Sequence, residues 1–188
     1  MNDNAQLGAA EAQYALGLAY STASDGERQV NLERAIACFH SALEYYSLST
    51  HPVQWAHLQQ ELGIAYREYL QGDGQTGIRK ALPALYSSLE VYDRTQFPEA
   101  WARTHFELGR TYIVLAAEDQ QSYLQKARTC FQSALLIYTM RDFPREWATT
   151  QNCLGDLYCQ SASDERYQTL KKALACYESA LLVYTRDA

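Results

Sequence analysis

The chain has 188 residues and a formal net charge of −6, because 22 Asp and Glu outnumber 16 Lys and Arg. Recognition of a phosphate backbone needs clustered basic side chains, and here the basic residues are scattered, which argues against a nucleic-acid partner. No stretch reaches the roughly 18 apolar residues of a membrane span, and the opening lacks the basic start and apolar run of a signal peptide. We therefore expect a cytoplasmic protein with no nucleic-acid partner and no membrane partner.

The same residues recur at a fixed interval of 46 positions along the chain. The clearest mark is a Leu-Gly pair followed by Tyr three residues after the glycine. These pairs are Leu16-Gly17, Leu62-Gly63, Leu108-Gly109 and Leu154-Gly155. Self-similarity at one period is the signature of stacked structural repeats. We therefore predict one repeat domain, residues 1–188, with four repeats at about 6–51, 52–97, 98–143 and 144–188.

Each repeat is predicted to form two helices, because its apolar and aromatic residues fall at helical spacings. In repeat three these helices are expected at about 98–116 and 122–140. Repeats two, three and four open with a proline that lies three residues ahead of a tryptophan, and proline suits the first helical position. These residues are Pro52 with Trp55, Pro98 with Trp101 and Pro144 with Trp147. The chain thus contains eight predicted helices.

Two kinds of residue inside the predicted helices disfavour helical geometry. Glycine inside a helix costs roughly 1 kcal/mol relative to alanine. The glycine of each Leu-Gly pair, such as Gly109, is therefore expected to allow close packing against the second helix. Pro83 falls inside the second helix of repeat two, where it removes a backbone hydrogen bond and crowds the preceding turn. We expect a kink there, or a late start of the helix near Lys80.

The recurring residues resemble the tetratricopeptide repeat (TPR) family, whose signature combines Leu-Gly, Tyr, Ala, an aromatic residue, a second Ala and a Pro at the junction. In repeat three these are Leu108-Gly109, Tyr112, Ala127, Phe131, Ala134 and Pro144. The repeat is 46 residues long and not 34, and the form resembles bacterial and cyanobacterial TPR arrays often found with CHAT-type protease domains. The resemblance implies an all-α, right-handed α-solenoid of four helix-turn-helix repeats.

The sequence offers no motif for catalysis, for a cofactor or for a metal ion. The four histidines show no paired-ligand spacing, and the glycine-rich segment at 72–77 lacks the Lys and Ser or Thr of a phosphate-binding loop. Cys38, Cys130 and Cys176 recur at one repeat position beside an aromatic residue, which indicates reduced thiols packed in the core. Glu61 and Glu107 occupy one position of neighbouring repeats and are expected to form a solvated edge. We expect no enzyme activity.

In the family that the chain resembles, first-helix residues that face away from the partner helix line an inner groove. Carried over to this chain, those positions predict a groove that binds a peptide or protein segment. Its predicted residues are His57, Gln60, Arg67, Arg103, Phe106, Arg110, Ile113 and Asn152. Arginines beside Phe106 suit a peptide with acidic and apolar residues, although these arginines could equally be ordinary solvated surface.

The leading functional hypothesis is therefore a protein–protein interaction scaffold. The alternative is a structural oligomerisation module or a fragment of a larger multidomain repeat protein, and the third is a ligand- or peptide-sensing regulator. The eighth helix reads LKKALACYESALLVYT, and its apolar residues cover more of its circumference than one partner helix can bury. This pattern predicts either that the chain is a piece of a longer array or that it forms a homodimer through the C-terminal helix.

Overall fold

The computed structural model describes residues 3–23, 27–69, 75–116, 120–161 and 166–185. Within these residues the chain is all-α, without strands, and the predicted number of eight helices is confirmed. The helices are α1 (Asp3–Thr22), α2 (Arg28–Leu43), α3 (Pro52–Glu68), α4 (Gln75–Ser88), α5 (Pro98–Leu115), α6 (Gln120–Ala134), α7 (Pro144–Gln160) and α8 (Arg166–Tyr184). This order is compatible with helical repeats, and the right-handed solenoid stays a prediction.

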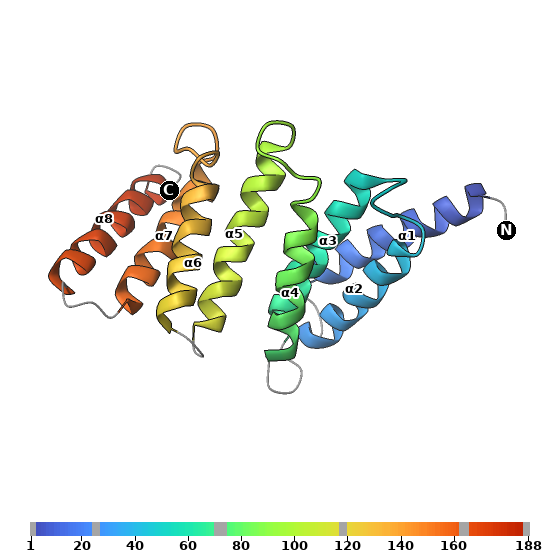
Figure 1. Cartoon of the computed structure of the whole chain (residues 1–188), viewed down its shortest axis with the longest axis horizontal. Coiled ribbons are helices and arrows are strands. Elements are labelled where there is room, and N and C mark those ends of the chain that lie inside the picture. The colour runs from blue at the N-terminus through green and yellow to red at the C-terminus, as the bar shows by residue number, and fades with distance from the viewer. Residues whose placement is uncertain (1–2, 24–26, 70–74, 117–119, 162–165, 186–188) are drawn as a thin grey trace. The chain divides into compact units, whose positions relative to one another are not determined.

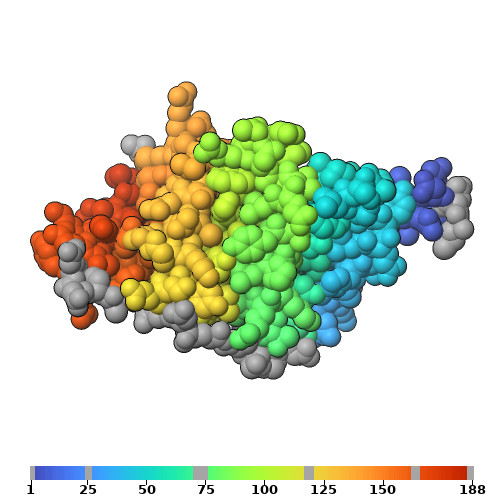
Figure 2. Space-filling model, in the orientation of Figure 1, coloured from blue at the N-terminus to red at the C-terminus, as the bar shows by residue number. Residues whose placement is uncertain are grey.

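The helices form two compact units, which we call the N-terminal unit (Met1–Asp93) and the C-terminal unit (Arg94–Ala188). In the N-terminal unit α1 packs on α2, α3 packs on α4, and α2 also contacts α3. The C-terminal unit has the same plan, with α5 on α6, α7 on α8, and α6 against α7. Figure 1 shows these pairs as helical hairpins, and side chains fill the space between the ribbons within each unit (Figure 2). The prediction of one domain is left open by this division.

The first helices of repeats two to four begin at the predicted prolines. Pro52, Pro98 and Pro144 are the first residues of α3, α5 and α7. At each start the residue before the proline is not helical, and its carbonyl accepts a hydrogen bond of 2.9 Å from the backbone N–H of the tryptophan. The first N–H of a helix has no partner within the helix, so proline loses nothing there. The repeated Pro and Trp thus fix where each of these helices starts.

The second helix of repeat three is shorter than its apolar pattern predicts. It ends at Ala134 and not near residue 140. Beyond that point the N–H groups of Leu136 and Ile137 donate to carbonyls only three residues back, which tightens the chain into turns. Tyr138 follows these turns and is buried. The apolar spacing was misleading because Tyr138 continues it, although its backbone is no longer helical. Tyr138 is buried while it lies in the non-helical segment that leads to Pro144.

Glycine permits close packing in each hairpin, as predicted. A Cβ atom added to Gly109 would lie 2.6 Å from Cε1 of the Phe131 ring, and one added to Gly155 would lie 2.6 Å from Cε1 of Tyr177. Both distances are far below van der Waals contact between carbon atoms. The ring of the second helix therefore lies directly on the bare backbone of the first helix. Phe131 is fully buried in this position.

The recurring cysteines belong to the same packed layer. Cys38 and Cys130 are buried, and Cys176 is half-buried. Burial raises the pKa of the Cys130 thiol to about 11, so this group stays protonated at neutral pH. These thiols are free, in agreement with the prediction that they are reduced packing residues.

Of the two outcomes expected for the second helix of repeat two, the late start near Lys80 is wrong, and the kink stays a prediction. Helix α4 begins at Gln75, and Pro83 lies inside it. Pro83 is exposed, as are Ala37, Thr129 and Ala175 at the same position of the other repeats. Its ring therefore displaces no core side chain, and the packing of Ala81, Ala84 and Leu85 on the opposite side holds the helix together.

The contact between glycine and ring predicts opposite effects for two Gly→Ala substitutions. Gly109→Ala should destabilise the protein by about 1–3 kcal/mol, because the new methyl group overpacks against Phe131. Gly8→Ala is the matched control, since it also lies in a helix but has no atom within 4 Å of the added Cβ. This control should be neutral or stabilising by up to about 1 kcal/mol. Urea unfolding measures both, and equal midpoints for the two variants would contradict the packing account.

Candidate functional site

The C-terminal unit contains a pocket of about 290 Å³ between α5, α7 and the turn that follows α6. Its lining residues are Arg103, Phe106, Glu107, Tyr138, Arg145, Glu146 and Thr149. Two predicted groove residues, Arg103 and Phe106, therefore lie together here. They come from one face of α5, whereas Arg145 and Glu146 come from the first turn of α7.

Charges of both signs surround the hydroxyl group of Tyr138 in this pocket. Burial is the main cause that raises the pKa of Tyr138 above its usual range. The carboxylates of Glu146, Glu107 and Glu99 raise this pKa further, whereas Arg103 lowers it. The pocket thus combines an aromatic floor with basic and acidic groups, an arrangement that suits a polar or charged segment with an apolar anchor.

Arg110 lies one helical turn after Phe106 on α5 and does not line the pocket. Its Nη1 atom is 3.6 Å from Oε1 of Glu107, and its Cζ atom lies 5.8 Å from the centroid of the Phe106 ring. Both contacts hold the guanidinium group over the groove face of α5. Arg110 therefore positions Phe106 and Glu107, and it remains accessible because its side chain is 40% exposed.

The N-terminal unit contains a second pocket, of about 240 Å³, between α1, α3 and the turns that follow α2 and α4. Its lining residues are Tyr14, Tyr46, Val53, Gln54, His57, Leu58 and Tyr92. The lining is mainly apolar and aromatic. His57 is the only one of the predicted groove residues that lies in it.

A short polar chain crosses this N-terminal pocket. The hydroxyl group of Tyr14 is 2.7 Å from Nδ1 of His57, and Nε2 of His57 is 3.9 Å from Oε1 of Glu61. The Tyr14 and His57 rings meet edge to face, with centroids 5.5 Å apart. If Tyr14 donates to Nδ1, the imidazole carries its proton on Nε2, on the side of the Glu61 carboxylate. These contacts fix the orientation of both rings.

The two pockets occupy the same positions of their repeats. Five pairs of lining residues are separated by two periods of 46 residues: Tyr14 and Phe106, Tyr46 and Tyr138, Val53 and Arg145, Gln54 and Glu146, and His57 and Thr149. Tyr92 corresponds to Tyr184, which does not line the C-terminal pocket but has its hydroxyl group 3.4 Å from Oγ1 of the lining residue Thr149. The fold therefore builds one pocket twice and lines it with different chemistry.

Four residues that were expected on an accessible surface are buried. Gln60 is 1% exposed and Arg67 is 8% exposed, so neither presents its side chain to a partner as the groove prediction requires. Glu61 and Glu107 are 6% and 7% exposed, so the expected solvated edge is wrong. Glu107 lies 3.6 Å from Nη1 of Arg110, which offsets part of the cost of burying its charge, and Glu61 lies 3.9 Å from Nε2 of His57. Ile113 and Asn152 are half-buried and line neither pocket.

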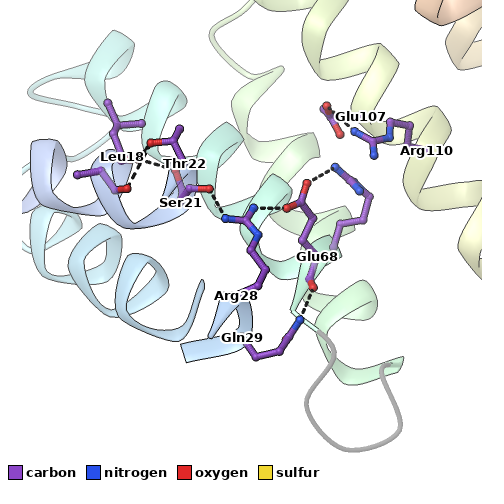
Figure 3. A network of polar contacts seen from close by, with 10 residues as sticks. Leu18, Ser21, Thr22, Arg28, Gln29, Glu68, Glu107 and Arg110 are labelled. Atoms are coloured by element: carbon purple, nitrogen blue, oxygen red, sulfur yellow. Dashed lines mark hydrogen bonds and ion pairs between the residues drawn. The ribbon is translucent and has the colours of Figure 1, made fainter. Parts of the chain in front are cut away.

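Arg67 belongs to a structural network and not to the groove. Its Nη2 atom is 3.3 Å from Oε1 of Glu68. Arg28 forms an ion pair with the same carboxylate and donates to the carbonyl of Ser21 at 2.6 Å (Figure 3). The backbone carbonyl of Glu68 accepts a further bond from Gln29 at 3.3 Å. This network joins the end of α1, the start of α2 and the end of α3.

Several pocket residues were not predicted from the sequence. Tyr46 and Tyr138 continue the apolar spacing of the second helix, which marks them as core residues, and both line a pocket. Arg145 and Glu146 directly follow Pro144, a position that indicates only the start of a first helix. The usable signal was their place in the repeat, because Val53 after Pro52 and Arg145 after Pro144 line the same pockets as residues of α1 and α5, respectively.

The described residues contain no group of three or more His, Cys, Asp or Glu that could hold a metal ion. In the same part of the chain, no helix combines the length and the apolar character needed to cross a bilayer. Comparisons with protein-family models, curated proteins and solved structures found no match.

His105 lies close to the pocket but faces the core. Its ring meets the Trp101 ring edge to face, with centroids 4.2 Å apart, and the described residues provide no hydrogen-bond partner for Nδ1. Burial lowers the pKa of His105 below its ordinary value of 6.5. The corresponding residues of the other repeats are Gln13, Gln59 and Gln151.

The lowered pKa of His105 predicts acid sensitivity. The native state favours the neutral imidazole, so the unfolded state binds a proton first as the pH falls through about 6.5. Below that pH the free energy of unfolding should fall by up to about 1 kcal/mol per pH unit. His105→Gln should remove this part of the pH dependence. Urea unfolding of both proteins at several pH values between about 7.5 and 5 provides the measurement, and parallel profiles would contradict the assignment.

Proposed function

We propose that this protein is a protein–protein interaction scaffold of the tetratricopeptide type, and that it binds a peptide or protein segment in the pockets between consecutive first helices. The observation that carries this proposal is the recurrence of the pocket. Two compact units of one chain place a cavity at the same repeat positions, and a buried tyrosine, Tyr46 or Tyr138, lines each cavity. Such recurrence favours a surface that contacts an extended partner at more than one point.

The C-terminal pocket indicates the chemistry of one contact. Arg103 and Arg145 line this pocket together with Phe106, and Thr149 adds a hydroxyl group. Guanidinium groups bind carboxylates through paired hydrogen bonds, and the Phe106 ring offers an apolar contact. We therefore propose that this pocket binds a segment with an acidic residue next to an apolar residue. The setting we propose for this activity is the cytoplasm, without a nucleic acid.

Charge reversal in the C-terminal pocket tests the scaffold proposal. A random peptide library displayed on phage is selected on the purified chain, and the affinity of enriched peptides is measured by fluorescence anisotropy. We expect acidic and apolar peptides, and we expect Arg103→Glu with Arg145→Glu to weaken them about tenfold or more.

The matched control for this experiment is Arg166→Glu, which makes the same change in charge at an exposed residue of α8 outside the pocket. It should leave the affinity within about twofold, because isolated surface charges contribute little. Unchanged binding by the double variant would move the site away from this pocket. A circular dichroism spectrum confirms that each variant keeps its helical content.

The exposed face of α8 favours a second candidate function, an oligomerisation module. Leu174, Leu181 and Leu182 are 60%, 58% and 54% exposed, and Leu170 and Tyr184 are each 43% exposed. At the position of Leu170, α2 and α6 carry Leu32 and Leu124, which are 1% and 5% exposed. A contiguous apolar face of this kind is typical of an interface. A two-fold contact between α8 helices of two copies would cover it.

Sedimentation of the purified chain tests this second function. At about 50 µM, where an interface of micromolar affinity is largely occupied, the chain should sediment as a dimer. Leu174→Glu with Leu181→Glu should give a monomer, because it places two carboxylates in the contact. Leu136→Glu is the control, since Leu136 is also 58% exposed but lies outside α8. A native monomer at this concentration would exclude the oligomerisation module.

A further inference from the structure

The two equivalent pockets differ in charge at corresponding positions. Arg103 in the C-terminal unit corresponds to Glu11 in the N-terminal unit, and Arg145 corresponds to Val53. Both arginines line the C-terminal pocket, whereas the N-terminal pocket has no Lys or Arg among its lining residues. Helix α1, which forms one wall of that pocket, contains Asp3 and Glu11 and no basic residue. The lining of the C-terminal pocket thus carries two Arg and two Glu, whereas that of the N-terminal pocket carries no Lys, Arg, Asp or Glu. The charged groups to be considered for the N-terminal pocket are therefore the carboxylates that lie beside it.

Aromatic rings make up most of the N-terminal pocket. Tyr14, Tyr46 and Tyr92 contribute three rings, and His57 contributes a fourth. Tyr46 and Tyr92 are 5% and 3% exposed, so their rings form a fixed floor. The Tyr92 hydroxyl group donates to the carbonyl of Val53 at 3.4 Å. The faces of tyrosine rings carry negative potential that attracts cations.

Two carboxylates add to this potential. Glu11 is exposed and lies close enough to Tyr46 that, after burial, its charge raises the pKa of the Tyr46 hydroxyl group. Glu61 is almost fully buried behind His57, with its Oε1 atom 3.9 Å from Nε2. A carboxylate in a low-dielectric environment attracts a nearby cation more strongly than a carboxylate in bulk water does.

We infer that the N-terminal pocket binds the cationic head of a basic side chain, the guanidinium group of an arginine or the ammonium group of a lysine in a partner segment. The volume of about 240 Å³ suits one such side chain and is below the usual range for drug-sized ligands. Ring faces and carboxylates supply the attraction, and Val53 with Leu58 contacts the aliphatic stem. This inference concerns a different unit and the opposite charge, and it does not depend on the acidic preference proposed for the C-terminal pocket.

A neutral apolar side chain is the competing occupant, since the same rings would also bury a leucine. Charge separates the two occupants. A basic side chain is attracted by Glu11, so its affinity for the pocket falls as salt is added. The affinity of a leucine side chain depends neither on the charge of Glu11 nor on the salt concentration. Glu11 is exposed and contributes no core packing, so it can be replaced without unfolding the protein.

The experiment uses four capped pentapeptides that have Arg, Lys, Leu or Glu between glycines. Each is titrated into the full chain, and the ring resonances of His57 are followed by NMR. We expect saturable shifts with the Arg and Lys peptides, at least about fivefold weaker binding of the Leu peptide, and no binding of the Glu peptide. A Leu peptide that binds as tightly as the Arg peptide overturns the inference, and so does the absence of any shift.

Substitutions then assign the binding to the pocket. Glu11→Arg, which copies the residue of the C-terminal unit, should weaken the Arg peptide at least about fivefold. Glu33→Arg is the control, because it makes the same change in charge at an exposed residue of α2 that does not line the pocket. Tyr14→Leu should weaken binding about fivefold, whereas Tyr14→Phe, which keeps the ring, should retain it within about twofold. Equal binding by Glu11→Arg and Glu33→Arg overturns the inference.

Failure here and failure of the scaffold proposal have different signatures. The affinity of the Arg103→Glu, Arg145→Glu variant for acidic peptides tests only the proposal for the C-terminal pocket. The affinity of the Glu11→Arg variant for basic peptides tests only the inference for the N-terminal pocket. Arg103→Glu with Arg145→Val gives the C-terminal pocket the residues of its counterpart, and it should give that unit measurable affinity for the Arg peptide. If the variant gains no affinity for the Arg peptide in its C-terminal pocket while the N-terminal pocket still binds this peptide, the residues at these two positions do not determine the charge preference.

Discussion

The separation of the two helices within each hairpin controls the rest of the structure, and it is set where a glycine meets a large side chain. In the third hairpin the Phe131 ring lies on the backbone of Gly109, and in the second hairpin Leu85 takes the same place against Gly63. Helix geometry then fixes every other pair of facing residues, because residues three and four apart share a face. A methyl group at these glycines would push the helices apart and change the register of each later contact. The tolerance for a helical glycine is thus a requirement of the packing.

That fixed separation explains why the pocket recurs at the same repeat positions. Once a hairpin has its register, the turn after the second helix places a buried tyrosine beside the start of the next first helix. Tyr46 and Tyr138 occupy this place in the two units. The residues above the tyrosine are not needed for the core, so they can change without loss of the fold. Glu11 and Arg103, or Val53 and Arg145, show how far their chemistry diverges at equal backbone positions.

The sequence predicts those features that a single local rule governs. Proline at the first helical position located the starts of α3, α5 and α7, and the cost of a helical glycine predicted the contact at Gly109. The end of α6 was predicted about six residues too late, because Tyr138 continues the apolar spacing although it is buried from a turn. Helical spacing reports that a residue is buried and does not report whether its backbone is still helical. Local propensity was also insufficient at Pro83. It allowed a delayed start of α4, whereas the helix begins at Gln75 because its opposite face is packed.

Accessibility of the groove was harder to predict than its position. The groove rule selects first-helix positions that face away from the partner helix, and it cannot tell which of them lie under neighbouring side chains. Arg103 and Phe106 line a pocket, whereas Gln60 at the position of Phe106 is 1% exposed.

Glu61 and Glu107 illustrate the consequence of this burial for charged side chains. A carboxylate at 6% or 7% exposure costs stability unless a cation or a donor lies nearby, and an apolar residue at the same place would often be as stable or more stable. Each of the two lies beside the groove face of its own first helix, next to His57 or Arg110. Their retention at positions where folding alone favours an apolar residue is the expected result if the groove face is used for binding, because local rules for stability are broken mainly at functional sites.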